Sequence, residues 1–207
     1  MSSKPIEQGK PCPGCQLRFQ CVCDRLTQFS ADLHIALLMH PNETTRETNT
    51  GQWLAQSLQS CSRHIWQRTQ PCPELITMIA SGDYLPYLLF PSQHSDAVKH
   101  AHREANSQHK PLLLIILDGT WQEAGKMLRK SDWLRALPQV HIEPSQPSRY
   151  RLRRNQQPGH LCTIEVGCEV LRELGYTNQA QQLEGFFDDY LNAFQADKSS
   201  HTFQAKS

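Results

Sequence analysis

Residues 112–121 read LLLIILDGTW, and this stretch decides how the chain folds. Its first six residues are all apolar, whereas a strand with one face in water would alternate apolar and polar residues. The run stops at Asp118-Gly119, and a helical pattern follows over residues 121–130. A strand that is buried on both faces and leads directly into a helix is typical of a parallel sheet covered by helices. We therefore predict an α/β fold.

The rest of the chain repeats this alternation of short apolar runs and amphipathic stretches, which favours a mostly parallel sheet with flanking helices. Further strands are expected at residues 34–39, 63–67, 87–90 and 140–142. Helices are expected at residues 51–59, 74–80, 95–106, 121–130, 163–174 and 178–195. Large apolar side chains recur at helical spacing in the last helix, which favours packing on the core over a dimer interface.

The chain has 207 residues, 38% of them apolar, and a net charge of +1. This length fits one α/β domain with a small appendage. We predict a Cys-rich N-terminal segment (residues 1–30), a main domain (31–196) and a disordered tail (197–207). No apolar run approaches the ~20 residues needed to cross a bilayer, and the N-terminus lacks the apolar stretch of a signal peptide. We expect a cytoplasmic protein with no membrane partner.

Charge is unevenly distributed along the sequence. Residues 123–154 contain eight Lys and Arg against three acidic residues. Such a basic region is typical of a surface that binds RNA or DNA, and it is equally typical of a solvated helix face. Charge alone leaves both interpretations open.

Four of the eight cysteines lie close together, at Cys12, Cys15, Cys21 and Cys23. Two tight pairs of thiolates can direct four sulfur atoms at one tetrahedral ion, and Gly14 fits the turn in the first pair. The spacing favours a structural zinc knuckle over free thiols, and over an iron–sulfur cluster because the close C-x-C pair is not a common cluster spacing. Four sulfur ligands leave no position for a catalytic water, so we expect the metal to stabilise the segment.

Several predicted strands end in loops with chemically useful residues. Asp118-Gly119-Thr120-Trp121 follows the central strand, His40-Pro41-Asn42-Glu43 follows an earlier one, and Pro91-Ser92 a third. Because ligands of open α/β sheets bind outside the carboxyl ends of the strands, we expect these loops to share one crevice. An alternative for Asp118 is that it only caps the following helix.

Five motifs, in order along the chain, resemble the DTW-domain family. They are the cysteine pairs, His40-Pro-x-Glu43-x-x-Arg46-x-Thr48-Asn49-Thr50-Gly51, Asp118-x-Thr120-Trp121, Ser148-x-Tyr150-x-x-Arg153 and Thr163-x-Glu165. Asp-x-Thr-Trp alone would occur by chance, but the ordered set is specific, and it covers roughly residues 12–190. A small departure is Cys162, where the family has Ser about as often, and we expect no change in the chemistry.

The resemblance implies a fold related to the trefoil-knotted SPOUT methyltransferases, with the cofactor held by the loops that form the knot. It also implies transfer of the 3-amino-3-carboxypropyl group of S-adenosylmethionine to N3 of a tRNA uridine, with release of 5′-methylthioadenosine. Bacterial members with one short domain look like those that act on the variable loop. The expected partner is tRNA, the co-substrate is S-adenosylmethionine, and the structural metal is Zn²⁺.

We assign the expected catalytic roles to Asp118, Thr120 and Trp121. Asp118 is either the base that accepts the N3 proton or an acceptor that orients the uridine. Trp121 stacks on the flipped uracil, faces the sulfonium or anchors its helix in the core. The expected cofactor-binding residues are Phe90, Pro91, Ser92, Asp118, Gly119, Leu161, Cys162, Thr163 and Glu165. For the last of these, the alternative is that it only caps its helix.

The expected RNA-binding residues are Arg46, Arg149, Tyr150, Arg151, Arg153 and Arg154. Guanidinium groups interleaved with an aromatic ring suit phosphates and an unstacked base, and Arg46 has the cofactor carboxylate as a second candidate partner. Two rival functions stay open: a SPOUT-type RNA methyltransferase and a non-catalytic zinc-containing RNA-binding protein. A thiol redox protein is the weakest reading. The sequence leaves the choice between a monomer and a homodimer open.

Overall fold

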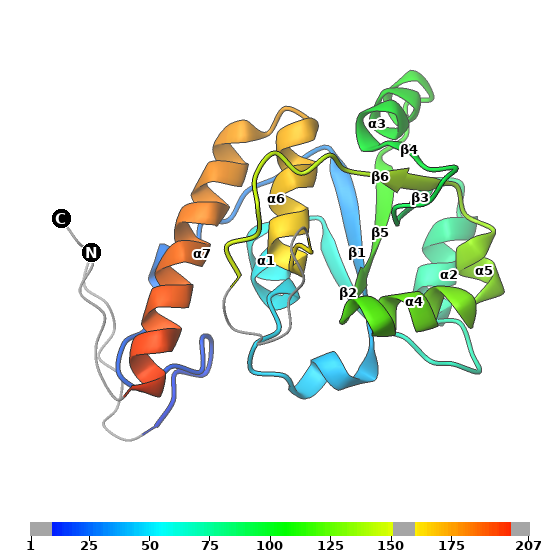
Figure 1. Ribbon diagram of the computed structural model, residues 1–207. Coiled ribbons are helices and arrows are strands. Elements are labelled where there is room, and N and C mark those ends of the chain that lie inside the picture. The colour runs from blue at the N-terminus through cyan, green and yellow to red at the C-terminus, as the bar shows by residue number, and fades with distance from the viewer. Residues whose placement is uncertain (1–9, 151–159, 200–207) are drawn as a thin grey trace.

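The computed structural model describes residues 10–150 and 160–199, and a six-stranded sheet lies at the centre of the molecule (Figure 1). The strand order is β2-β1-β5-β3-β6-β4, and every neighbouring pair is parallel. The strands are β1 (Leu33–Met39), β2 (Cys61–Ile65), β3 (Leu85–Leu89), β4 (Asp96–Ala97), β5 (Leu112–Asp118) and β6 (Gln139–His141). The predicted α/β class with a mostly parallel sheet is confirmed.

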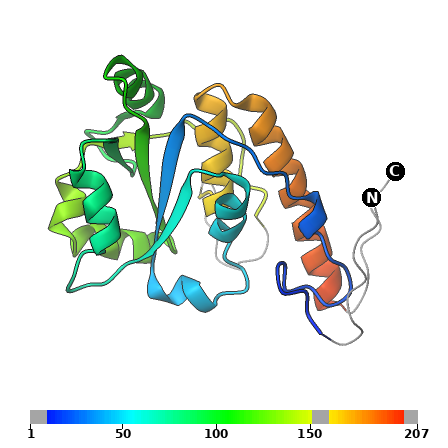
Figure 2. The same ribbon diagram turned by 180° about the vertical axis from the view of Figure 1, so that it is seen from behind.

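Helices cover both faces of this sheet. They are α1 (Gly51–Ser57), α2 (Pro73–Ala80), α3 (Val98–Ser107), α4 (Trp121–Arg129), α5 (Asp132–Arg135), α6 (Thr163–Glu173) and α7 (Thr177–Lys198). Figure 1 and the view from behind in Figure 2 place α1, α6 and α7 on one side and α2, α4 and α5 on the other. The architecture is therefore a three-layer α/β/α sandwich.

The central strand explains why its sequence is apolar without alternation. On β5, Leu112, Leu114 and Ile116 join the hydrophobic core under α1, α3, α6 and α7. Leu113 and Ile115 join the second core, which α2, α4 and α5 cover. Successive side chains of a strand point to opposite faces, so a strand between two cores needs apolar residues at every position.

The C-terminal helix α7 belongs to the first core, as its apolar stripe predicted. Phe186 and Tyr190 pack against Trp53 of α1, with ring centroids 5.2 and 4.9 Å apart. The helix continues to Lys198, past the predicted end at residue 195, because Asp197 accepts hydrogen bonds from the backbone N–H groups of Arg18 and Phe19. The predicted tail therefore begins inside the helix, and residues 200–207 lie outside the described part of the chain.

Three local predictions need correction. Strand β2 begins at Cys61, two residues before the predicted start, because Cys61 pairs with Ile35 of β1. Helix α3 begins at Val98 and not at residue 95, because Asp96 and Ala97 form β4 beside β6. The four-residue helix α5 was not predicted, since one turn is too short to show a periodicity.

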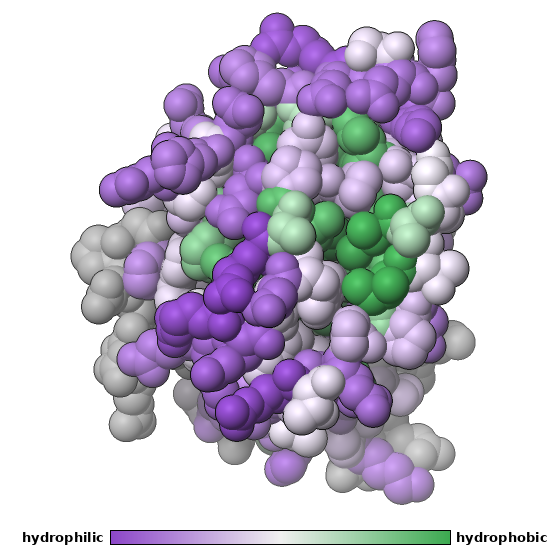
Figure 3. All heavy atoms as spheres, turned by 90° about the vertical axis from the view of Figure 1, so that its right-hand side faces the viewer, coloured by the Kyte–Doolittle hydropathy of each residue, from purple (hydrophilic) through white to green (hydrophobic). Residues whose placement is uncertain are grey.

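The trefoil knot implied by the family resemblance stays a prediction, because residues 151–159, which lead toward α6, lie outside the described residues. Among residues 10–150 and 160–199, no helix is both long enough and apolar enough to cross a membrane. The face of the molecule that carries α2, α4 and α5 is mostly hydrophilic, and its apolar side chains gather in limited patches (Figure 3).

Close packing of α1 against α6 generates a stability prediction. A Cβ atom at Gly167 would lie 2.6 Å from Cδ2 of Leu54, whereas a Cβ at Gly185, an exposed position of α7, would meet nothing within 4 Å. We expect Gly167→Ala to lower the free energy of unfolding. Overpacking destabilises a protein by about 1–3 kcal/mol, whereas the higher helix propensity of alanine stabilises it by only about 1 kcal/mol.

The control is Gly185→Ala, which we expect to raise the free energy of unfolding by about 0.5–1 kcal/mol. Urea denaturation of both variants and the wild type is the measurement. A Gly167→Ala protein as stable as the wild type would contradict the close packing of these helices.

Candidate functional site

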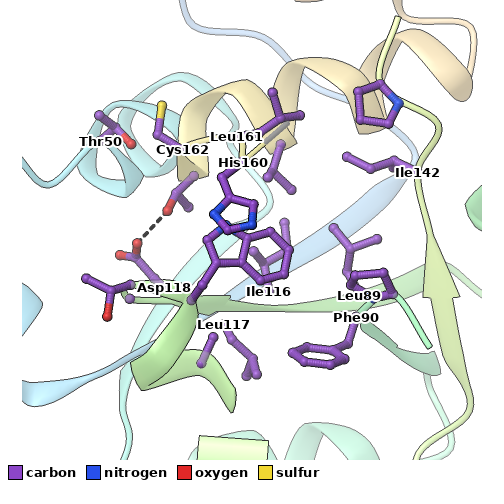
Figure 4. A pocket seen from close by; sticks show the side chains of 18 of the residues that line it. Thr50, Leu89, Phe90, Ile116, Leu117, Asp118, Ile142, His160, Leu161 and Cys162 are labelled. Carbon is purple, nitrogen blue, oxygen red and sulfur yellow. Dashed lines mark hydrogen bonds between the residues drawn. The ribbon is translucent and has the colours of Figure 1, made fainter. Parts of the chain in front are cut away.

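A cavity of about 630 Å³ opens where the carboxyl ends of β3, β5 and β6 meet the amino ends of α4 and α6 (Figure 4). Its walls are mainly apolar, with Leu89, Phe90 and Ile142 at one end and Asp118, Thr50 and Cys162 at the other. Parallel strands place their carboxyl ends at one edge of the sheet, and the loops after β3 and β5 meet in this cavity as predicted. The predicted place of His40–Glu43 in the same crevice is wrong, because that loop does not line the cavity. The cavity thus combines an apolar chamber with one polar end.

Asp118 is the one carboxylate among the described residues that line this cavity. It ends β5 and is only 2% exposed. Its Oδ1 accepts a hydrogen bond of 2.5 Å from the Thr163 hydroxyl, and its Oδ2 accepts one of 2.8 Å from the Asn49 amide. The side chain is therefore fixed by donors from α6 and from the loop before α1.

The alternative role of Asp118 as a helix cap is wrong. The N-cap of α4 is Thr120, whose hydroxyl accepts a hydrogen bond from the Glu123 N–H while the Glu123 carboxylate accepts from the Thr120 backbone. This capping box occupies the hydroxyl of Thr120, which also donates to Glu123 at 2.9 Å. Thr120 lines the cavity, but its side chain is used to begin α4, so it positions the loop.

A buried network of charged and polar groups supports Asp118 from behind. The Asn49 amide donates to both Asp118 and Glu43, and the Glu43 carboxylate is 2% exposed. Arg46 pairs with Glu43 and makes two hydrogen bonds of 2.9 Å to Glu123. The motif around residues 40–51 therefore works as a scaffold that joins Asp118 to the first turn of α4.

Gly51 belongs to the same support. A Cβ atom at this position would lie 2.7 Å from Oδ2 of Asp118. Only glycine lets the start of α1 approach the carboxylate this closely.

The start of α6 forms the other polar wall. Cys162 is its N-cap, and the thiol accepts from the Glu165 N–H while the Glu165 carboxylate accepts from the Cys162 N–H. Burial, with the neighbouring Glu165 carboxylate, raises the pKa of the Cys162 thiol far above its ordinary value. The thiol is thus a neutral cap, a role that the alternative residue Ser would fill equally well.

Trp121 lies at the rim of the cavity and is 43% exposed, so the alternative of a core tryptophan that anchors its helix is wrong. Its ring lies 4.5 Å from that of His160, with an angle of 31° between the planes. A large exposed aromatic side chain at the mouth of a cavity is a candidate platform for a base.

Two predicted cofactor-binding residues lie away from the cavity lining. Ser92 is exposed, and its backbone carbonyl accepts a hydrogen bond from the Ser95 hydroxyl. Glu165 accepts hydrogen bonds from the Ser148 hydroxyl and the Arg149 N–H, so its carboxylate joins the residue 148–149 loop to α6. The capping alternative for Glu165 is therefore the one that the structure supports. The predicted site residues that do line the cavity are Phe90, Pro91, Asp118, Gly119, Thr120, Trp121, Tyr150, Leu161, Cys162 and Thr163.

The predicted RNA-binding residues divide into three groups. Tyr150 is 6% exposed, and its hydroxyl donates to the Thr48 carbonyl at 2.9 Å, so in this conformation it is part of the core and does not stack on a base. Arg46 and Arg149 are held by carboxylates, the second by Asp188 at 2.9 Å. Arg151, Arg153 and Arg154 lie outside the described residues.

Sequence reasoning missed several lining residues, among them His160, His141 and Ile142. His141 ends β6 and Ile142 follows it, and this was the shortest predicted strand, which gives a weak signal. No motif marked His160, and only its position beside Trp121 reveals its place in the site.

The four N-terminal cysteines converge as their spacing predicted. Their Sγ atoms all lie within 4.8 Å of one another, and the distances from Cys12 to Cys21 and Cys23 are 3.4 and 3.8 Å. Four thiolates at ~2.3 Å from a tetrahedral zinc ion would stand roughly 3.8 Å apart, so the donors fit that metal. A Cβ at Gly14 would lie 2.6 Å from the Cys23 Sγ, which explains the glycine.

Without a cation the cysteines differ in acidity. Burial alone would raise the pKa of Cys12, but hydrogen bonds from the Cys15 and Gly14 backbones outweigh it and lower the pKa to about 7. Burial raises the pKa of Cys15 to about 11, and burial together with the neighbouring sulfurs raises that of Cys23 further. Holding all four as thiolates therefore requires a positive charge among them.

Comparisons with known proteins agree with the motifs. A family model described as the DTW domain matches residues 9–195. The chain is 28% identical over 190 residues to the tRNA-uridine aminocarboxypropyltransferase 2 of Macaca fascicularis, across 86% of this chain and 62% of that protein. It is 26% identical over 188 residues to the protein of the same name from Mus musculus, again across 86% and 62%.

The protein of that name from Drosophila melanogaster is 26% identical over 182 residues, across 84% of this chain and 70% of the relative. The chain thus spans less than two thirds of the macaque and mouse proteins that it matches. No solved structure matches it.

The support network predicts a dependence of stability on pH. Burial alone would raise the pKa of Glu123, but hydrogen bonds from Arg46, the Thr120 backbone and Asn42 outweigh it and hold the pKa far below its ordinary value. The resulting stabilisation is present above the unfolded pKa of about 4.3 and is lost as the pH falls below it. We expect Glu123→Gln to be less stable than the wild type at neutral pH and to lose less stability on acidification.

Urea denaturation from about pH 7 to about pH 3 measures this difference. The control is Glu47→Gln, which removes a carboxylate that is 67% exposed and paired with Lys198, and it should follow the wild-type curve. Parallel curves for wild type and Glu123→Gln would show that the network does not stabilise the ionised form.

Proposed function

Because the chain belongs to the DTW-domain family, we propose that it is an enzyme that transfers the 3-amino-3-carboxypropyl group of S-adenosylmethionine to N3 of a tRNA uridine. The relatives named above support the reaction class. The observation that carries the proposal is the buried Asp118 carboxylate, held by two donors at the polar end of a cavity of about 630 Å³.

The cavity has the dimensions and chemistry that such a co-substrate needs. Its volume lies within the range of about 300–1,000 Å³ that is common for small-molecule sites. The apolar end with Phe90 and Pro91 suits an adenine ring. The amino ends of α4 and α6, at Gly119 and Leu161–Thr163, border the cavity and offer partial positive charge to a carboxylate. The bound sulfonium would make the adjacent carbon open to attack.

We assign Asp118 to the uridine. Its Oδ1 accepts from the Thr163 hydroxyl and its Oδ2 from the Asn49 amide, which fixes the carboxylate at the polar end of the cavity, where it can act as the acceptor for an N3–H donor. As the bond from N3 to carbon forms, the carbon–sulfur bond breaks, its electron pair neutralises the sulfonium, and the N3 proton passes to Asp118. An ordinary aspartate is a weak base for this proton, so transfer accompanies bond formation.

Trp121 is placed to hold the base. Its exposed ring at the rim can stack on a uracil that has left the RNA helix, with His160 moving aside from its contact at 4.5 Å. Stacking there would bring the uracil edge toward Asp118, which lies three residues before α4 begins. We therefore retain uracil stacking as the role of Trp121.

The segment 151–159 is our candidate for phosphate contacts. Tyr150 and His160, the described residues on either side of it, both line the cavity. The sequence between them contains three arginines, Arg151, Arg153 and Arg154. We propose that these guanidinium groups bind the phosphates that flank the base. Action on the variable loop, assembly as a homodimer and a cytoplasmic location stay predictions.

The test of this function is a reaction of the purified protein with unmodified tRNA and S-adenosylmethionine, with the small-molecule product identified by chromatography. We expect 5′-methylthioadenosine and an aminocarboxypropyl uridine. Asp118→Asn should lower kcat by about 10²–10⁴-fold, because it removes the proton acceptor while keeping the side-chain shape. A binding measurement with S-adenosylmethionine should change little.

Other products would point elsewhere. S-adenosylhomocysteine would identify an RNA methyltransferase, which differs only in the carbon that faces the uridine. No product, with intact tRNA binding, would identify an RNA-binding protein. Wild-type turnover in the Asp118→Asn enzyme would show that the Asp118 carboxylate does not accept the proton.

We also propose that the four cysteines hold a structural zinc ion. Gly14 offers a sharp test, because a Cβ at that position would displace the Cys23 Sγ 2.6 Å away. We expect Gly14→Ala to lose zinc to a chelator at least tenfold faster than the wild type, about the cost of disturbing one contact of a metal site. Gly185→Ala, which adds the same methyl group in open space, should retain zinc. Equal loss rates would contradict the assignment.

A further inference from the structure

A second group of metal-binding side chains lies outside the cavity and the four-cysteine cluster. His64 comes from β2, Cys72 precedes α2, and Glu74 lies in the first turn of that helix. One donor atom from each lies within 4.8 Å of the others. His64 Nδ1 lies 3.5 Å from Cys72 Sγ, and Cys72 Sγ lies 2.9 Å from a carboxylate oxygen of Glu74.

These distances suit a tetrahedral ion of the zinc class. With a metal–nitrogen distance of ~2.0 Å and a metal–sulfur distance of ~2.3 Å, the two donors of a tetrahedral site stand roughly 3.5 Å apart. The imidazole and thiol already have this separation. The carboxylate would move outward by roughly 0.6 Å when the metal replaces the thiol proton, and the exposed Glu74 side chain is free to do so.

A hydrogen-bonded chain behind His64 orients its ring. His64 Nε2 lies 2.8 Å from the Ser62 hydroxyl, which in turn lies 2.9 Å from His34 Nε2. If His64 donates from Nε2 to Ser62 and Ser62 donates to His34, the lone pair of His64 Nδ1 faces Cys72. Metal-binding histidines almost always have such a partner for the second ring nitrogen.

Helix capping does not account for this placement. Cys72 is the N-cap of α2, yet its side chain makes no capping hydrogen bond. His64 is 8% exposed and held by the sheet, so its position is fixed before any ligand arrives.

We propose that His64 Nδ1, Cys72 Sγ and a Glu74 carboxylate oxygen bind a second divalent ion of the zinc class, with water in the fourth position. The ion would join the carboxyl end of β2 to the amino end of α2 and close the connecting residues 66–72 into a short loop. Trp66 in that loop stacks on His40 at 5.7 Å, and the His40 N–H donates to the Asp118 carbonyl. The metal would therefore brace the strand edge beside the proposed active site.

The experiment is a measurement of Zn²⁺ bound per chain after equilibration of the full-length protein in a zinc buffer. The wild type should hold two equivalents. Cys72→Ser should hold one, and Cys61→Ser, a matched change of a thiol outside both clusters, should hold two. Ser62→Ala should lower the affinity for the second Zn²⁺ ion about 10–100-fold, which is the usual effect of removing a group that orients a metal ligand.

Cobalt substitution identifies the donors independently of enzyme activity. Subtracting the absorption spectrum of Co²⁺-loaded Cys72→Ser from that of the Co²⁺-loaded wild type should leave a thiolate charge-transfer band. Its intensity should be roughly one quarter of that of the four-cysteine site, because the second site has one thiolate ligand and the first has four. A zinc content that Cys72→Ser leaves unchanged would overturn the proposal, whether or not the four-cysteine cluster binds zinc. A circular dichroism spectrum of each variant shows whether it is folded, so that loss of metal can be distinguished from loss of structure.

Discussion

Burying a carboxylate at the end of a central strand costs free energy unless hydrogen-bond donors surround it. Asp118 meets this requirement with the Asn49 amide and the Thr163 hydroxyl, which come from segments 69 and 45 residues away in the chain. The same carboxylate therefore joins β5, the loop before α1 and the start of α6. Gly51 completes the arrangement by leaving room beside Oδ2. The cavity exists where these segments are held together.

A chain of ionic contacts extends this constraint to the rim of the cavity. The Asn49 amide is shared between Asp118 and Glu43, and Arg46 connects Glu43 to Glu123. Glu123 in turn closes the capping box that begins α4, and Trp121 is the first residue of that helix. The orientation of the exposed ring is thus coupled to the buried carboxylate. Removing one partner from such a buried network leaves another charge uncompensated, so the motif works as a unit.

The cysteine segment is attached to the domain by a different set of contacts. Cys15, Leu17 and Val22 are buried in the first core, and Arg25 pairs with Asp189 on α7 at 2.8 Å. Asp197 near the end of α7 accepts two backbone N–H groups from the segment. The two ends of the described chain therefore stabilise one another. A metal in the cysteine cluster would strengthen the N-terminal side of that contact.

The sequence by itself determined the α/β class, the central strand, the four cysteines as one cluster and the position of Asp118 at the end of a strand. Each of these depends on local periodicity or on close spacing, which a linear sequence records. Only the tertiary structure decided that Thr120 and not Asp118 caps α4, that Tyr150 is buried, that Arg46 and Glu165 are held by internal partners, and that His160 lies against Trp121. A polar side chain can serve a ligand or its own fold with the same atoms, and its partners lie far away in the sequence, so packing alone settles which role it takes.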